Sequence, residues 1–146
     1  IKKLLENVMT KKKMDIITIK EDFSHIFEIK EALQKNELVA IHGDRFLEGS
    51  KTINAEFLGQ EARFPAGPFY LAIKYNKPIT FVSAVKESRK QYHFFATMPK
   101  DYRMENPESF NNELLQTMVS DYAREMEKII EKYPEQWFNY YYFWNT

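Results

Sequence analysis

Hydrophobic residues follow two different periods along this chain, and the periods predict both strands and helices. Short runs rich in β-branched and aromatic residues are typical of strands. We expect strands over residues 15–20, 38–41, 78–85 and 91–98. The turn between the last two covers only residues 86–90, and so short a connection predicts an antiparallel hairpin.

Helical spacing of apolar residues marks the segment between the first two strands. Its apolar stripe consists of Phe23, Ile26, Ile29 and Leu33. Asp22 or Ser24 can cap its start, and Asn36 stands where a left-handed C-terminal cap is useful. A strand, a helix and a strand within this length predict a parallel pair with a right-handed crossover.

The longest predicted helix lies in the last third of the chain. Asn106-Pro107-Glu108 is a strong helix start, and the helix ends before Pro134. Its apolar residues are Phe110, Leu114, Met118, Tyr122, Met126, Ile129 and Ile130. We expect this face to pack on the sheet, and the tail beyond Pro134 to fold back so that Trp137 is buried.

Together these elements predict an α/β fold: a mixed, partly parallel sheet with flanking helices and a long C-terminal helix. Residues 1–9 show the spacing of a helix end, and residues 69–73 that of a short helix. With 146 residues, the chain has the length of one domain with a proper core. We therefore expect residues 1–146 to form a single domain.

Composition and charge exclude several classes of protein. The 21 basic residues balance 21 acidic ones, which argues against nucleic acid as the main partner. The absence of cysteine excludes a disulfide scaffold and a cysteine-built zinc site. No apolar run approaches the roughly 18 residues of a membrane-spanning helix. Lys11, Lys12 and Lys13 fit either a solvated turn or an anionic membrane surface.

Two familiar kinds of site fail on spacing. Residues 43–52 follow a predicted strand as a phosphate loop does, but five residues separate Gly43 from Gly49 where four are needed, and Ser50 replaces the lysine. The histidines, which are His25, His42 and His93, lie far apart without metal-ligand spacing. A structural role is favoured for the first and third, whereas a dyad of His42 with a neighbouring carboxylate stays open.

The candidate binding residues follow the strand at 38–41. Asp44 and Arg45 lie where open α/β sheets bind ligands, at the carboxyl end of a strand. They can pair with each other, or Arg45 or Arg63 can bind an anionic head group, since guanidinium suits phosphate and carboxylate. Gly67-Pro68 opens a helix whose free N–H groups favour the same anion. We predict Asp44, Arg45, Arg63 and Gly67 as substrate-binding residues, and no metal site.

Several segments of the chain resemble a known family. Residues 37–45, 56–59 and 64–72, in this order and spacing, are similar to the C-terminal half of the bacterial lipid A biosynthesis acyltransferases, members of the lysophospholipid acyltransferase superfamily. Residues 133–138 also resemble the proline-glutamate-glutamine-tryptophan ending of that family. The likeness spans roughly residues 20 to 144.

The resemblance implies transfer of a fatty acyl chain from a thioester of acyl carrier protein or coenzyme A to a hydroxyl of a glycolipid or lysolipid, with no bound cofactor. The catalytic motif of the family is a histidine, four residues and then an acid, and its histidine deprotonates the acceptor hydroxyl. In this sequence Lys30, Leu47 and Met98 stand five positions after the three histidines. We therefore predict no catalytic residue in this chain.

The missing motif, and a start at Ile1 without an initiator methionine, suggest the C-terminal part of a longer acyltransferase, inactive alone. We expect the parent to act at the cytoplasmic face of the inner membrane, with the acyl donor, the lipid acceptor, the membrane surface and its N-terminal half as partners, and the fragment itself to be soluble. The alternative is a non-catalytic lipid- or anion-binding α/β module. Seven of the eight residues from 137 to 144 are aromatic, which fits a tail that covers the sheet edge or the missing N-terminal half, or one that lies at a membrane interface.

Overall fold

The computed structural model describes residues 15–19, 24–102, 112–140 and 143–144 of the chain. The predicted helix end at 1–9, the lysine cluster at 11–13, Asp22, Phe23, the helix start at 106–108 and Phe110 lie outside these residues. The chain divides into two compact units, residues 1–40 and 41–146, which are taken in turn.

The first unit contains α2 (Ser24–Gln34), the helix predicted from its apolar stripe. Ile29 is its buried residue. Asn36 has the left-handed φ of 57° that its position predicted. The Asn36 N–H donates to the Leu33 carbonyl at 3.2 Å, and the Glu37 N–H donates to Ala32 at 3.0 Å. These two bonds form a Schellman motif, so the predicted C-terminal cap is confirmed.

The predicted strands at 15–20 and 38–41 are wrong for the described residues, and so is the parallel pair between them. Residues 15–19 and 37–42 are not in strands. Their apolar side chains, Ile16, Ile19, Leu38 and Ile41, are exposed. A strand is defined by the neighbour that accepts its hydrogen bonds, and apolar composition does not supply that neighbour. Every strand pair in the described residues is antiparallel, in two separate two-stranded sheets.

The first sheet is a hairpin that the sequence pattern did not reveal, formed by β1 (Thr52–Phe57) and β2 (Gln60–Pro65). Leu58 and Gly59 make its two-residue turn, with φ values of 52° and 77°. Two successive positive φ values are typical of the type I′ turn that suits hairpin twist. Inward positions alternate along both strands and are occupied by Ala55, Phe57, Ala62 and Phe64, all buried.

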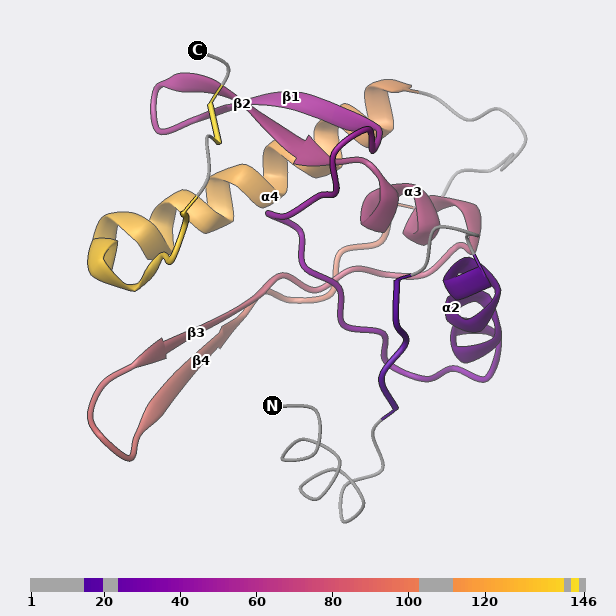
Figure 1. Ribbon diagram of the computed structural model, residues 1–146, viewed down its shortest axis with the longest axis horizontal. Helices are drawn as coiled ribbons and strands as arrows, with labels where there is room; N and C mark the ends of the chain where they lie inside the picture. The colour runs from indigo at the N-terminus through magenta and orange to yellow at the C-terminus, as the bar shows by residue number, and fades with distance from the viewer. Residues whose placement is uncertain (1–14, 20–23, 103–111, 141–142, 145–146) are drawn as a thin grey trace. The chain divides into compact units, whose positions relative to one another are not determined.

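The long helix α4 (Asn112–Lys132) packs on this hairpin, and the short helix α3 (Gly67–Lys74) follows β2 directly (Figure 1). Pro68 lies in the first turn of α3, as predicted. The buried residues of α4 are Leu115, Met118, Val119, Ala123, Met126 and Ile130. The predicted stripe included Met118, Met126 and Ile130 correctly, whereas Leu114, Tyr122 and Ile129 are partly buried. Leu115 and Ala123, each one position further along the helix than Leu114 and Tyr122, are buried in their place, and Val119 adds to the contact.

The second sheet is the hairpin that the sequence predicted, formed by β3 (Val82–Lys86) and β4 (Tyr92–Ala96). An isolated bridge between Ile79 and Lys100 extends the pairing beyond the open end of the hairpin, where Val82 faces Ala96. The free edge of β3 is covered at Lys86, whose N–H donates to Gln136 Oε1 at 2.6 Å and whose carbonyl accepts from Gln136 Nε2 at 3.0 Å. Gln136 thus takes the place of a neighbouring strand residue at this edge.

The aromatic tail folds back after a 3₁₀ turn (η1, Pro134–Gln136) and lies against β1 and β2. Phe143 is 1% exposed and fully in the core. The indole N–H of Trp144 donates to the Phe57 carbonyl at 3.1 Å, and Trp144 bridges Ala62 as an added strand residue. Trp137, predicted to be buried, is only partly so, with its ring 5.4 Å from that of Phe57. The tail is therefore anchored chiefly by Phe143.

We expect Phe143→Ala to lower the free energy of unfolding by about 3–5 kcal/mol, because it empties a large aromatic site among well-packed rings. Trp137→Ala should cost less, since part of its ring already meets solvent. The matched control is Phe138→Ala, an exposed aromatic of the same tail, with an expected change within about 0.5 kcal/mol. Chemical denaturation of the three variants measures the order. Equal losses at Phe138 and Phe143 would show that the tail is not docked.

Candidate functional site

The loop at residues 43–46 carries two of the predicted binding residues, and it is held in place by α4. Gly43 lies against the Tyr122 ring so closely that a Cβ there would be 2.7 Å from Tyr122 Cζ. The ring itself is fixed by three others, with centroid distances of 5.9 Å to Phe64, 5.7 Å to Phe69 and 5.3 Å to Phe81. Glycine is therefore required at position 43 for close approach to a ring that has little room to move.

Asp44 and Arg45 form an ion pair, with Arg45 Nε 3.7 Å from Asp44 Oδ1. The Asp44 side chain is 17% exposed and that of Arg45 is 53% exposed. The Asp44 side chain is thus mostly withdrawn from water, while about half of the Arg45 side chain is exposed. This pairing was one of the two predicted roles of the two residues.

Arg63 meets the same loop from β2. Its guanidinium carbon lies 5.5 Å from the centre of the Phe46 ring, a cation–π distance. Arg63 is exposed because it occupies an outward position between the buried Ala62 and Phe64. Arg63 thus contacts the residue that follows Arg45.

Gly67 lies elsewhere, in a hollow of about 350 Å³ lined by Lys51, Ala66, Gly67, Tyr70 and Leu115. None of the other three predicted residues lines it. The Ala66 N–H donates to the Lys51 carbonyl at 3.0 Å, which places Lys51 beside the start of α3. The structure thus adds Lys51 to the candidate residues. Its only signal in the sequence was its place in the failed phosphate loop.

That loop is confirmed not to be a phosphate loop, because the chain after Lys51 enters strand β1 and not a helix. The histidines form no site together in the described part of the chain, where no group of metal-ligating side chains occurs. His93 Nδ1 lies 3.0 Å from Glu87 Oε1, and its ring stacks on Phe95 at 4.3 Å. His42 is exposed, and among the described residues no carboxylate pairs with it.

A second polar cluster, centred on Asp121 of α4, was not predicted. Its Oδ2 accepts hydrogen bonds from the Tyr102 hydroxyl at 2.6 Å and from Lys100 Nζ at 3.1 Å, and Arg124 lies 3.7 Å from Oδ1. Partial burial acts to raise the pKa of Asp121, but these hydrogen bonds and the two cations lower it on balance. Burial and the bond to Asp121 raise the pKa of Tyr102. The cluster ties residues 100–102 to α4.

The described residues form a mixed α/β fold with two antiparallel hairpins and a long C-terminal helix. Comparison with protein families defines the class more closely: the model of the bacterial lipid A biosynthesis acyltransferases matches residues 2–146. The chain therefore belongs to the bacterial lipid A biosynthesis acyltransferase family. No curated protein sequence matches it significantly. Within the described residues, no helix is both long and apolar enough to cross a bilayer.

We expect Gly43→Ala to destabilise the chain by about 1–3 kcal/mol, because the new methyl group meets the fixed Tyr122 ring. In a Tyr122→Ala background the same substitution should cost much less, since the ring is gone, and the two changes should couple by more than about 0.5 kcal/mol. Gly67→Ala is the control, because a Cβ at Gly67 meets nothing within 4 Å. If the stability losses of Gly43→Ala and Tyr122→Ala were additive in denaturant melts, this would contradict the contact between the two residues.

We expect Asp121→Asn to lower the stability at neutral pH by about 1–3 kcal/mol, since it removes charge-assisted hydrogen bonds. Because the pKa of Asp121 in the native state lies below its ordinary value of 3.8, the ionised carboxylate stabilises the native state fully above that pH. This stabilisation is lost as the pH falls through the lowered pKa. The difference in stability between Asp121→Asn and the unmodified chain should therefore become smaller below about pH 4. Thermal melts across pH measure it. If this stability difference did not change with pH, the charge of Asp121 would be excluded as its source.

Proposed function

We propose that this chain supplies the acceptor-binding part of an acyltransferase that moves a fatty acyl chain from an acyl thioester to a hydroxyl of a glycolipid or lysolipid. The family match supports acyl transfer as the reaction. The thioester is carried by acyl carrier protein or coenzyme A, and no cofactor takes part. The observation that carries the binding role is the Asp44–Arg45 pair, in which about half of the Arg45 side chain is exposed beside a packed loop.

The anionic head group of the lipid acceptor is bound, in this proposal, by Arg45 and Arg63. Asp44 orients Arg45 through the ion pair, and the Phe46 ring holds the Arg63 guanidinium through a cation–π contact. A planar guanidinium can donate two parallel hydrogen bonds to a phosphate or carboxylate, which a lysine cannot do. Gly67 and Lys51 offer a second anion-binding point at the start of α3, suited to another charged group of the acceptor.

The catalytic base lies, in this proposal, outside the residues of this chain. The sequence contains no histidine followed by four residues and an acid. Acyl transfer to a hydroxyl needs a base to remove its proton during attack on the thioester carbonyl. We therefore assign the base to an N-terminal half of a longer enzyme that acts at the cytoplasmic face of the inner membrane.

A non-catalytic lipid- or anion-binding module is the second candidate, and the missing motif is the observation that favours it. Both functions use the same arginines to bind an anionic head group. They differ in whether a histidine-containing half restores acyl transfer when it is supplied.

We expect the purified chain to bind soluble short-chain phosphatidic acid, and Arg45→Ala to weaken this binding at least tenfold, which corresponds to about 1.4 kcal/mol. Arg45→Lys should recover only part of the loss, because the lysine ammonium cannot bind bidentately. Arg124→Ala is the control, an exposed arginine on the polar face of α4. Calorimetric titration measures the affinities. Equal binding by Arg45→Ala and the unmodified chain would overturn the site.

The same preparation tests catalysis. With an acyl coenzyme A and a lysolipid, we expect no release of free coenzyme A thiol above a buffer control. The chain contains no cysteine, so a thiol reagent reports only the coenzyme. Thiol release by the chain alone would show that its own residues provide the base.

A further inference from the structure

The two faces of the β3–β4 hairpin differ in what they contact. Val85 and Phe95 lie on the inner face, where Val85 is fully buried and Phe95 packs beside Tyr133 at 6.1 Å. The cross-strand register places the alternate residues on the outer face, with Ala84 opposite Phe94 and Lys86 opposite Tyr92. The outer face is thus apolar and aromatic over most of its length, yet it lies in solvent.

The exposed side chains of this face continue onto the C-terminal tail. We call the outer patch the six residues Val82, Tyr92, Phe94, Met98, Phe138 and Tyr140, all of which are exposed. Phe94 is 69% and Met98 83% exposed. Phe138 reaches the hairpin across a shallow hollow of about 480 Å³, which Ala84, Lys86, Tyr92 and Gln136 also line. Tyr92 of the hairpin and Phe138 of the tail thus share one hollow, and exposed apolar side chains gathered in this way mark an interaction site more often than singly scattered ones do.

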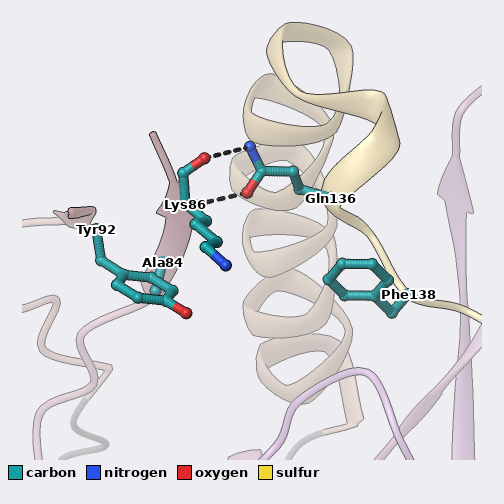
Figure 2. A pocket seen from close by; sticks show the side chains of 5 residues that line it. All are labelled: Ala84, Lys86, Tyr92, Gln136 and Phe138. Atoms are coloured by element: carbon teal, nitrogen blue, oxygen red, sulfur yellow. Dashed lines mark hydrogen bonds between the residues drawn. The ribbon is translucent and has the colours of Figure 1, made fainter. Parts of the chain in front are cut away.

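Basic residues accompany the outer patch. Between Val82 and Met98 the chain carries Lys86, Arg89 and Lys90 against a single acid, Glu87. The Glu87 carboxylate already lies 3.0 Å from His93. In Figure 2 the Lys86 side chain extends between the rings of Tyr92 and Phe138. The hairpin is therefore locally cationic in a chain whose net charge is zero.

We propose that the outer patch docks on an anionic lipid bilayer, with its aromatic side chains at the level of the head groups. Tyrosine and phenylalanine side chains with adjoining lysines and arginines suit the boundary between acyl chains and charged head groups. The core of a protein–protein interface, by contrast, is depleted of lysine, and Lys86 lies in the middle of this patch. Charge and apolar surface together therefore favour a lipid bilayer as the partner of the outer patch.

This inference goes beyond the proposed function, because the outer patch shares no residue with the predicted head-group site. Binding to a membrane surface would keep the acyltransferase where its lipid acceptor is found. It requires neither catalysis nor Arg45.

The test is co-sedimentation of the purified chain with vesicles of equal parts phosphatidylcholine and phosphatidylglycerol. We expect Tyr92→Ser with Phe94→Ser to lower the vesicle-bound fraction at least about tenfold. Phe27→Ser is the control, an equally exposed aromatic on α2. Arg89→Gln with Lys90→Gln should weaken binding roughly tenfold on these vesicles but little on pure phosphatidylcholine. Lys30→Gln with Lys35→Gln removes the same charge elsewhere and should have less effect.

A second measurement avoids substitutions that could unfold the hairpin. Because the chain has no cysteine, Phe94→Cys can carry a single polarity-sensitive dye. We expect its emission to shift to the blue on anionic vesicles, and a dye at Ser50→Cys to stay unchanged. No shift at position 94, or equal loss of binding in the hairpin and control variants, would overturn the proposal. Self-association that depends on Phe94 without vesicle binding would overturn it in favour of a protein contact.

The two proposals fail separately. Loss of the outer patch should leave calorimetric binding of soluble phosphatidic acid intact, whereas Arg45→Ala should leave vesicle binding intact. A hairpin variant that lost both would show one shared surface and overturn this inference.

Discussion

The ring of Phe57 at the end of β1 is the contact on which the larger unit depends. It is fully buried, and its centroid lies 5.6 Å from Phe64, 5.3 Å from Phe143 and 6.1 Å from Trp144. One residue later, the Leu58 N–H donates to Glu127 of α4 at 2.6 Å. The hairpin, the tail and the long helix therefore meet within two residues. The Phe64 ring meets Phe57 edge-to-face and the Trp144 ring stacks on it, and aromatic pairs of either kind add about 0.5–1.5 kcal/mol to the burial of apolar surface.

The contact between the hairpin turn and α4 also explains an unfavourable backbone conformation at Leu58. Leu58 has a φ of 52°, a region that costs a non-glycine residue roughly 1–2 kcal/mol. Asparagine or glycine would be easier in the first position of this turn. The hydrogen bond from the Leu58 N–H to the Glu127 carboxylate is charge-assisted, and such bonds contribute about 1.5–3 kcal/mol, which is enough to offset the strain. The helix thus stabilises a turn that the local sequence alone does not favour.

The same reasoning separates what the sequence could predict from what it could not. Three helix boundaries and the hairpin at 82–96 are fixed by local signals: Asn36 as a left-handed cap, Pro68 in a first turn, Pro134 after the end of α4, and a short charged turn. The β1–β2 hairpin was missed because its inward positions include Ala55 and Ala62, which give little hydrophobic contrast, and its turn is Leu-Gly. The parallel pair was wrong because pairing is a property of two segments and not of either pattern. At the candidate site, Asp44 and Arg45 were found because they are neighbours in the chain. The contact of Arg63 with Phe46 joins segments far apart in the sequence, and Lys51 lies beside Gly67 because the hairpin register pairs Thr52 with Pro65.

The C-terminal helix then links the two surfaces that carry the functional proposals. Tyr122 supports Gly43 and so fixes the loop of Asp44 and Arg45. Gln136, four residues after the end of α4, holds the edge of β3 through Lys86 and so fixes the hairpin. Tyr122 belongs to α4 itself, whereas Gln136 lies in the 3₁₀ turn η1 that follows the helix and packs against it. A change that loosened α4 as a whole would therefore disturb both surfaces at once. Substitutions at the exposed ends of the contacts, at Arg45 or Phe94, leave the helix intact, which is why they can separate head-group binding from bilayer docking.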